Sequence, residues 1–404
     1  MKATTDWPSL PLTQAFWFQE GPGVRNWQFT TSGIKLLNVA NIEKGGTLNL
    51  EKTDRHLDET EVAKKYSHFL VDAGDLVIAS SGISFDDDGL LRTRGAFVRA
   101  EQLPLCLNTS TIRFKAIDGV SDLRFLRLWL NGREFRSQIT KLVTGTAQQN
   151  FGPSHLKATK ITLPPLAEQR RIAEVLDRAE ALRAKRRADL AQLDSLTQSV
   201  FLDLFGDPAT NPKGWPRKPA GEIGRVITGN TPPRANPGNY GNAIEWIKSD
   251  NINTPHYYLT KADEGLSESG KSIARIVPAG SILVTCIAGS PDCIGNAAMA
   301  DREVAFNQQI NAFVPEYGDP HFYYAQILVG KRLIQEASTA GMKGMVSKGR
   351  FEQIRLLVPP IELRREFARQ TVAVEKVKAA QRASLAELDA LFATLQHRAF
   401  RGEL

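Results

Sequence analysis

The spacing of apolar residues marks out two long stretches of the chain. The first runs from Leu166 to Phe205 and the second from Ile361 to Arg401, and neither contains glycine or proline. In both, apolar residues return every three or four positions among alanine, leucine, arginine, glutamate and lysine, which favour helices. Each stretch follows a pair of prolines, which suits a first helical turn. The pattern predicts two long helices, with glycines 206 and 402 as their stops.

The two predicted helices are copies of one another. Pro359 follows Pro164 by 195 residues, and the same offset aligns Phe205 with Phe400 without a gap. An apolar face needs a partner, and the nearest one of similar length is the other helix. We expect an antiparallel pair, a coiled coil about 57 Å long, and the alternative is two separate surface helices. The apolar residues expected at the contact are Ile172, Val175, Ala179, Leu182, Leu190, Leu193, Leu196 and Val200 in the first helix and Phe367, Val374, Val377, Leu385, Leu388, Leu391 and Leu395 in the second.

The segments before the two helices share one order of elements. Each has short strand-like runs broken by turns, then a helical segment, then a polar loop that leads towards the long helix. In the first segment these are residues 34–42, 71–82, 123–139 and 144–150. In the second they are residues 244–252, 277–289, 322–336 and 339–345. The spacing between the copies drifts while the order survives, which indicates an internal repeat with different insertions.

This repetition predicts the fold class, α/β (α+β), and the domain organisation. We expect two mixed α/β heads with sheet cores, joined by the helix pair in a pseudo-two-fold repeat. The expected boundaries are 1–163 for the first head, 164–206 for the first long helix, 207–358 for the second head and 359–404 for the second long helix.

Composition adds a class of partner and a compartment. The chain has 404 residues, 42% apolar and 24% charged, as in soluble globular proteins. Its net charge of +7 favours a polyanionic partner. The three cysteines form no CxxC pair, which fits a reducing cytoplasm. No run approaches the roughly 18 apolar residues of a membrane span.

Sequence motifs for catalysis and for cofactor binding are absent. There is no GxGxxG loop for a dinucleotide and no GxxxxGK[ST] loop for ATP. The tetrapeptide Thr231–Arg234 has the two prolines of an amino-methyltransferase loop, but lacks its hydrogen-bonding first residue and its aromatic residue. The six histidines are scattered, and Asp86, Asp87 and Asp88 lack the other oxygen ligands of a calcium loop. We therefore expect no catalytic residue, no cofactor and no metal in this chain.

The helices repeat closely, whereas the heads differ at most positions. A duplicated framework with two different heads suggests a device that holds two recognition surfaces at a set distance. If the polyanion is B-DNA, a rod of about 57 Å spans about 17 base pairs. Two heads on such a rod would meet two short sites, separated by bases that neither head reads.

Polar and basic residues at predicted strand ends and loops are the candidates for DNA contact. Phosphates are bound by lysine, arginine and backbone N–H groups, and base edges by arginine, asparagine and glutamine. The candidates are Asn38, Asn41, Ser80, Ser81, Arg92, Arg94, Gln148 and Gln149 in the first head and Lys248, Ser249, Asn251, Thr285, Gln308, Gln309, Lys343 and Lys348 in the second. For each, the alternative is a hydrogen-bonded turn or a solvated side chain. The basic run Arg183–Arg187 either contacts phosphate across the spacer or is the solvated face of the helix.

Several segments of the chain match one known family: Glu20–Trp27, Gly33–Ile42, Thr228–Arg234, Asn236–Tyr240, Ile244–Ile252, the two strands that follow Ala-Gly, and both helix starts after the double prolines. Along essentially its whole length, the chain resembles the specificity subunits of type I restriction-modification systems. The resemblance implies two target-recognition domains, each reading one half of a split double-stranded DNA sequence. It also implies that two DNA methyltransferase subunits dock on the helices and that restriction subunits, which act as motor and nuclease, join the complex. Methylation with S-adenosylmethionine and cleavage with ATP and Mg²⁺ would belong to those partners.

The first half departs from the second in lacking its Thr-Pro-Pro element. Two other functions are alternatives to a specificity subunit. One is a scaffold of another DNA-targeting defence complex that reads no sequence, which would bind DNA with salt dependence but without sequence preference. The other is a catalytic DNA methyltransferase or endonuclease, and a methyltransferase would bind S-adenosylmethionine itself.

Overall fold

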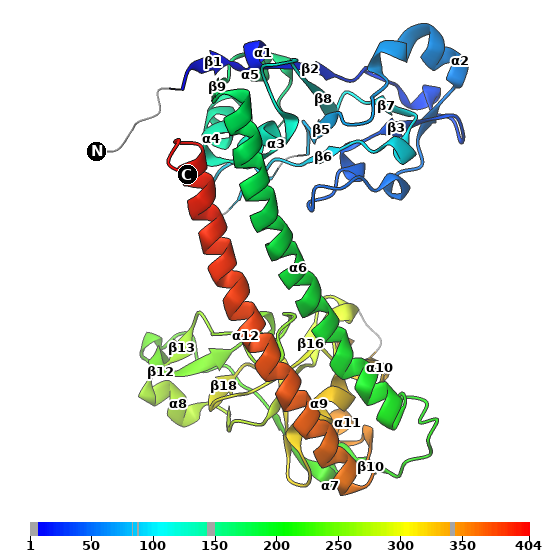
Figure 1. The fold of residues 1–404 in the computed structure, drawn as a ribbon. Coiled ribbons are helices and arrows are strands. Elements are labelled where there is room, and N and C mark those ends of the chain that lie inside the picture. The colour runs from blue at the N-terminus through cyan, green and yellow to red at the C-terminus, as the bar shows by residue number, and fades with distance from the viewer. Residues whose placement is uncertain (1–6, 83, 87–88, 144–149, 340–343) are drawn as a thin grey trace. The chain divides into compact units, whose positions relative to one another are not determined.

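The computed structural model describes residues 7–82, 84–86, 89–143, 150–339 and 344–404. The chain divides into two compact units. Unit 1 is Met1–Ala184 with Ala386–Leu404, and unit 2 is Lys185–Leu385. Each unit holds one globular part, here head 1 or head 2, together with a portion of both long helices (Figure 1).

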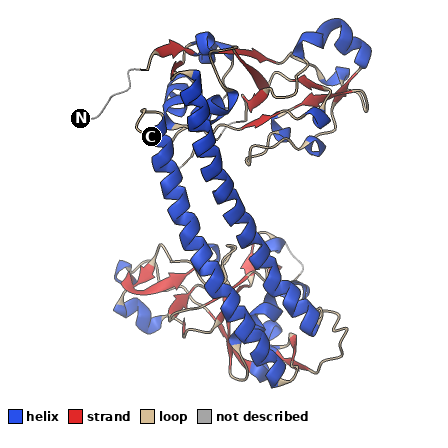
Figure 2. Ribbon diagram, viewed as in Figure 1, coloured by secondary structure: helices blue, strands red, loops and turns tan. Residues whose placement is uncertain are grey.

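Both predicted long helices are present. Helix α6 spans Leu166–Phe205 and helix α12 spans Ile361–Ala399, and Figure 2 shows them as the two longest helices. Helix α6 ends where Gly206 adopts a φ of +77°, a conformation that favours glycine over other residues. The predicted stop at this glycine is confirmed.

The described residues of head 1 form three sheets. The main sheet is antiparallel with the order β2-β8-β5-β6, the second has the order β4-β3-β7 with β3 and β7 parallel, and β1 pairs with β9. The strands are β1 (Ser9–Pro11), β2 (Phe16–Glu20), β3 (Ile34–Leu37), β4 (His56–Leu57), β5 (Leu76–Ala79), β6 (Gly95–Phe97), β7 (Leu105–Leu107), β8 (Thr111–Ala116) and β9 (Lys160–Thr162). The helices are α1 (Leu12–Ala15), α2 (Glu59–Glu61), α3 (Leu123–Asn131), α4 (Arg133–Leu142) and α5 (Pro153–Lys157).

In the described part of head 2 there are four sheets. The main sheet has the order β11-β19-β15-β17, the second has the order β13-β12-β18-β14, and β10 pairs with β21 and β16 with β20. The strands are β10 (Arg217–Pro219), β11 (Gly224–Thr228), β12 (Tyr240–Ile247), β13 (Gly265–Leu266), β14 (Ile276–Val277), β15 (Ile282–Thr285), β16 (Ile287–Ala288), β17 (Ala297–Met299), β18 (Val304–Phe306), β19 (Ile310–Pro315), β20 (Gly344–Met345) and β21 (Arg355–Leu357). The helices are α7 (Ala220–Ile223), α8 (Glu268–Ile273), α9 (Pro320–Val329), α10 (Lys331–Glu336) and α11 (Lys348–Glu352).

The two heads therefore share the topology of the main sheet and one parallel strand pair. Strand for strand, the main sheets match in order, and the parallel pair β3–β7 corresponds to the parallel pair β12–β18. The predicted helical segments are present, but each is broken by a glycine that the sequence reading did not identify. Gly132 separates α3 from α4, and Gly330 separates α9 from α10.

One apolar core in each unit joins the main sheet, the helix beside it and an end of the long helices. In unit 1 the core includes Phe114 of β8 and Leu176 of α6, and the ring of Phe400 lies 5.3 Å from that of Phe125. In unit 2 the equivalent Phe205 is fully buried. This packing anchors each head on the helices, because apolar surface removed from water stabilises by roughly 25 cal/mol per Å².

An ion triad links the two long helices in unit 1. Arg183 of α6 donates to Asp389 of α12 at 2.6 Å and also pairs with Glu180 of its own helix. The Arg183 guanidinium lies 4.3 Å from the ring centre of Phe392. These contacts join the first half of α6 to the last part of α12.

The equivalent triad links the helices in unit 2. Lys378 of α12 lies 2.7 Å from Asp194 of α6 and 2.5 Å from Glu375. Lys378 and Glu375 are only 4% and 6% exposed. Each member follows or precedes its counterpart in unit 1 by 195 residues. Here the last half of α6 meets the first part of α12, so the predicted antiparallel pairing is confirmed.

The apolar residues predicted at the helix contact are buried to different degrees. Ile172 and Phe367 are fully buried, and they belong to the head cores. Nine are partly buried, namely Val175, Ala179, Leu190, Leu193, Val200, Val374, Leu385, Leu388 and Leu395. The other four, Leu182, Leu196, Val377 and Leu391, are between 43% and 57% exposed. Charged triads occupy part of the face between the helices, which leaves these four side chains in solvent.

Candidate nucleic-acid interface

In each head, a glycine lets one loop pack directly against the backbone of a neighbouring turn. At the end of β2, a Cβ on Gly21 would lie 2.5 Å from the backbone of Asn108. After β11, a Cβ on Gly229 would lie 2.2 Å from the carbonyl oxygen of Asn307. No side chain fits at either position, so glycine is required for this close approach. The loop after each strand therefore lies on the turn that precedes β8 or β19.

In head 1 this turn meets the end of β5. The N–H of Ser80 donates to the carbonyl of Ser110 at 3.0 Å, and the carbonyl of Ser80 accepts from Phe151 at 2.9 Å. The N–H of Gly82 donates to the side chain of Asn150 at 3.3 Å. These contacts gather three segments of the chain into one polar edge. Edge 1 consists of residues 80–82, 108–110 and 150.

The predicted asparagines are engaged inside the heads. Asn41 is fully buried, and its side chain accepts from the backbone N–H of Asn38 at 2.9 Å. Asn38 is also buried and accepts from Asn108 at 3.0 Å. In head 2, Asn251 is buried and accepts from the backbone N–H of Lys248 at 3.0 Å. All three hold turns, so their side chains are not available to a DNA base in this structure.

Two predicted arginines line a basic pocket in head 1. Arg92 and Arg94 surround a cavity of about 230 Å³ together with Lys44 and Arg136. Arg94 donates to the carbonyl of Gly82 at 3.2 Å, which connects the pocket to edge 1. Four cationic side chains around one hollow suit an anionic ligand.

The remaining predicted residues of head 1 differ in access. Ser80 is buried and Ser81 is half-buried. Gln148 and Gln149 lie outside the described residues. Among the described residues predicted to contact DNA in this head, Arg92 alone is exposed.

In head 2 the corresponding edge brings together residues predicted from separate parts of the sequence. Ser249 donates to the side chain of Gln309 at 3.4 Å, and Thr231 donates to the side chain of Gln308. Lys248 precedes Ser249 and is partly exposed. Edge 2 consists of residues 230–234, 248–249 and 307–309.

Three predicted residues of head 2 lie away from edge 2 or outside the description. Thr285 is fully buried, and its hydroxyl has no hydrogen-bond partner among the described residues. Lys348 is exposed at the start of α11 and lies 3.6 Å from Glu352. Lys343 is not among the described residues.

Arg234 joins edge 2 although it was not predicted as a contact. It forms two hydrogen bonds with Glu264, which also lies 2.6 Å from Lys248. Hydrogen bonds from Arg234 and then Lys248 lower the pKa of Glu264 to about 2. The arginine was visible after two prolines, but its partner lies 30 residues further along the chain. No local pattern connects the two.

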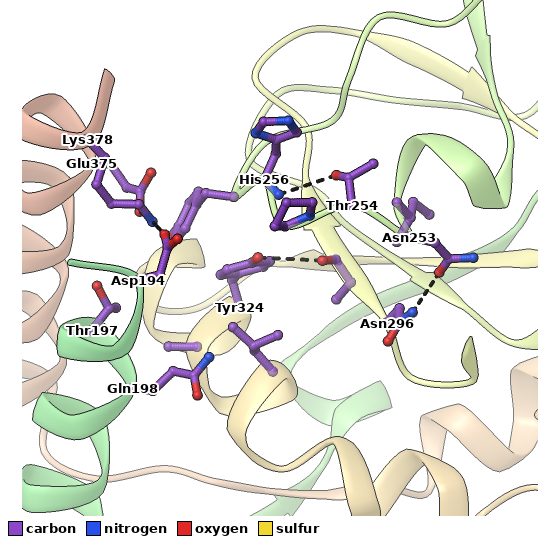
Figure 3. Close-up of a pocket in the computed structure, with 16 residues that line it drawn as sticks. Asp194, Thr197, Gln198, Asn253, Thr254, His256, Asn296, Tyr324, Glu375 and Lys378 are labelled. Carbon is purple, nitrogen blue, oxygen red and sulfur yellow. Dashed lines mark hydrogen bonds and ion pairs between the residues drawn. The ribbon is translucent and has the colours of Figure 1, made fainter. Parts of the chain in front are cut away.

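A cavity of about 420 Å³ lies beside the helices of unit 2 (Figure 3). Lys378 and Glu375 line one side, and residues 252–257 line another. Figure 3 shows Asn296 donating to Asn253 on the loop side, a contact of 2.8 Å. None of the described residues predicted to contact DNA lines this cavity.

The structure also locates the residues considered for metal binding. Asp86 accepts from the N–H of Leu90 at 2.8 Å and pairs with Arg136, whereas Asp87 and Asp88 lie outside the described residues. Within the described ranges, no group of three His, Cys, Asp or Glu residues is placed to hold a metal ion. In the same part of the chain, no helix is both long and apolar enough to cross a membrane.

Comparison with known proteins supports the resemblance noted in the sequence. The family described as "Type I restriction modification DNA specificity domain" matches residues 34–192 and 212–385. The specificity subunit of type I restriction enzyme HindI from Haemophilus influenzae is 27% identical over 175 residues, covering 40% of this chain and 36% of that one. The MjaVIII specificity subunit from Methanocaldococcus jannaschii is 25% identical over 196 residues, covering 48% and 44%. The matched regions thus span less than half of these relatives.

Solved structures resemble the fold at low sequence identity. The type I restriction-modification S subunit from M. genitalium has a TM-score of 0.56 at 16% identity, with 99% of this chain and 98% of that one covered. A chain from a structure on complex assembly and conformational transition of the type I system has a TM-score of 0.57 at 17% identity, with both chains fully covered. Since the two family matches cover most of its length, the chain belongs to the type I restriction-modification DNA specificity domain family.

Proposed function

We propose that this chain is the DNA-specificity subunit of a type I restriction-modification complex, in which each head reads one half of a bipartite target. The observation that carries the proposal is the contrast between the heads. Their main sheets have the same strand order, but edge 1 and edge 2 carry different side chains. Equal frameworks with unequal polar edges suit a protein that reads two different short sequences.

The helix pair sets the spacer between the two half-sites in this proposal. A helix of 40 residues is about 60 Å long at 1.5 Å per residue. That length corresponds to about 18 base pairs of B-DNA. The net charge of +7 supports binding to the phosphate backbone.

The chemistry resides in partner subunits in this proposal. Two DNA methyltransferase subunits that use S-adenosylmethionine dock on the helices, and restriction subunits that use ATP and Mg²⁺ join them. The sequence offers neither a cofactor loop nor a catalytic motif of those enzymes. The relatives named above come from a bacterium and an archaeon, and we place the complex in a prokaryotic cytoplasm.

Mapping of modified adenines across the host genome tests the proposal. Long-read sequencing would compare the wild-type strain, a strain with this gene deleted, and the deletion strain carrying the gene on a plasmid. We expect one split motif with a fixed gap to lose modification on deletion and regain it on complementation. An unchanged map, or the loss of a motif without a gap, would contradict the proposal. DNA binding that depends on salt but not on sequence would favour the scaffold alternative.

A further inference from the structure

The loop of edge 2 is fixed in place without help from Arg234. The backbone N–H of Asn230 donates to Phe306 at 3.0 Å, and its side-chain amide donates to Ile273 at 2.8 Å. The indole of Trp246 donates to the carbonyl of Asn230 at 3.2 Å. The hydroxyl of Tyr240 donates to the carbonyl of Pro232, in the same loop, at 2.7 Å. The ion pairs of Arg234 are therefore not needed to hold this loop.

Two cations of edge 2 share one carboxylate oxygen. Arg234 Nη2 lies 3.0 Å from Oε2 of Glu264, and Lys248 Nζ lies 2.6 Å from the same atom. The two nitrogens are consequently close enough to each other for one phosphate group to reach both. Because the two cations face a single carboxylate, the cluster has a net positive charge.

Aromatic rings limit the movement of both cations. The Arg234 guanidinium lies 4.3 Å from the ring centre of Tyr240 and 5.2 Å from that of Trp246. Lys248 Nζ lies 5.3 Å from the same Trp246 ring. Such contacts attract cations to the ring face. Nevertheless the Arg234 side chain is 55% exposed, so the restrained guanidinium still faces solvent.

Both cations keep hydrogen-bond donors for a ligand. A guanidinium has five N–H donors, and Glu264 accepts from one N–H on each of the two terminal nitrogens of Arg234. Lysine has three donors, and Glu264 is the acceptor seen for Lys248 within the described residues. An exposed ion pair alone contributes little to stability. A restrained pair of cations with unused donors is better explained by an oxyanion ligand.

We propose that Arg234 and Lys248 form a preformed binding site for one backbone phosphate of the DNA at edge 2, with the ring of Trp246 restraining both cations and Glu264 as their shared counter-ion. This inference rests on the proposed function and names the chemistry of one of its contacts. A phosphate contact fixes the position of the head on the duplex and carries no sequence information. Base reading then falls to neighbouring groups such as Gln308 and Gln309.

The test uses the complex purified from its host through a tag on this chain. Its probes are a duplex that carries the motif found by adenine mapping and a scrambled duplex of the same length. Dissociation constants are measured by fluorescence anisotropy over a range of salt concentrations. R234A and K248A are compared with R225A, which removes an exposed arginine of the same head paired with Glu316 at 3.1 Å.

We expect R234A and K248A each to reduce the slope of log affinity against log salt by about 0.9. If a variant and the wild type bind equally at 1 M salt, the variant then binds about eightfold more weakly than the wild type at 0.1 M salt, by the same factor on both duplexes. R225A should leave the slope unchanged. E264Q keeps both cations and removes a negative charge, so it should bind at least as tightly as the wild type.

Three results would overturn the phosphate site. R234A and R225A could behave alike, which would make the effect one of net charge alone. R234A could relax the preference for one base pair of the motif, which would make Arg234 a base-reading residue. E264Q could lose binding as R234A does, which would make the cluster purely structural. If the wild-type complex does not prefer the motif duplex, the proposed function itself fails, before any variant is considered.

Discussion

Head 1 and head 2 share buried turns and differ at their exposed polar edges. The turn held by Asn41 recurs around Asn251, and the close approach of Gly21 recurs at Gly229. At the exposed edges, in contrast, head 1 has a basic pocket and head 2 has a cation pair on aromatic rings. The difference teaches that the repeated residues maintain the framework, whereas the heads vary at the exposed edges where we propose contact with DNA.

The ion triads of the two units make the same comparison on the helices. Arg183 occupies in unit 1 the position that Lys378 occupies in unit 2. The unit 2 triad is deeper, because Lys378 is 6% exposed at its side chain and Arg183 is 16% exposed. The same arrangement of charges thus occurs at two depths of burial. Substitutions in the two triads can therefore show how burial changes its contribution to stability.

The largest expected effect compares Phe205 with its counterpart Phe400. Phe205 is fully buried among three phenylalanine rings at 4.9–5.7 Å, whereas Phe400 is partly buried beside Phe125. We expect F205A to lower the free energy of unfolding by about 3–5 kcal/mol and F400A by about 1–2 kcal/mol. Urea denaturation followed by circular dichroism measures both. Equal losses would show that the two helix ends are anchored alike despite their different burial.

A smaller effect compares Lys378 with Arg183. K378A leaves the carboxylate of Glu375 buried, with Arg382 at 3.9 Å as its remaining ion-pair partner among the described residues. We expect a loss of about 2–3 kcal/mol in the free energy of unfolding, because an uncompensated buried charge is costly. R183A should cost about 1 kcal/mol, since the carboxylates of its partners are roughly two-fifths exposed and stay hydrated. The same denaturation experiment checks the ranking, and a larger loss for R183A would contradict it.

Local patterns in the sequence were sufficient for the framework of the fold. The double prolines, the unbroken apolar period and Gly206 predicted both long helices, and the order of runs predicted two similar heads. The contact residues were harder to predict, because the sequence does not distinguish an asparagine at a DNA surface from one that holds a buried turn. Asn41 could be assigned to the turn only once its hydrogen bond to Asn38 was seen.

Contacts between distant residues explain the rest of the difference. Arg234 and Glu264 are brought together by the pairing of β12 with β13, and the triads depend on the register of two helices that are far apart in sequence. The apolar period suggested a continuous stripe between the helices. Charged side chains share that face, and Leu182 and Leu391 are exposed. Sequence spacing alone does not decide which face of a helix meets its partner.

The smallest expected effect compares two acids near the edges of the heads, Glu20 in head 1 and Glu264 in head 2. Burial raises the pKa of Glu20 above its ordinary 4.5, whereas the cations around Glu264 lower its pKa to about 2. Glu264 therefore stabilises the fold above pH 4.5, and this contribution is lost as the pH falls towards 2. Glu20 acts in the opposite sense, because burial disfavours its charged form, so it destabilises the fold as the pH rises through its raised pKa.

We expect E264Q to lower the free energy of unfolding at pH 6 by about 0.5 kcal/mol, since exposed pairs contribute little, with no difference from the wild type near pH 2. E20Q should instead raise the free energy of unfolding at pH 7, and its advantage should disappear as the pH falls below 4.5. Thermal unfolding of the two variants and the wild type between pH 2 and pH 7 measures both trends, and parallel rather than opposite trends would show that the acids at the two edges have equivalent surroundings.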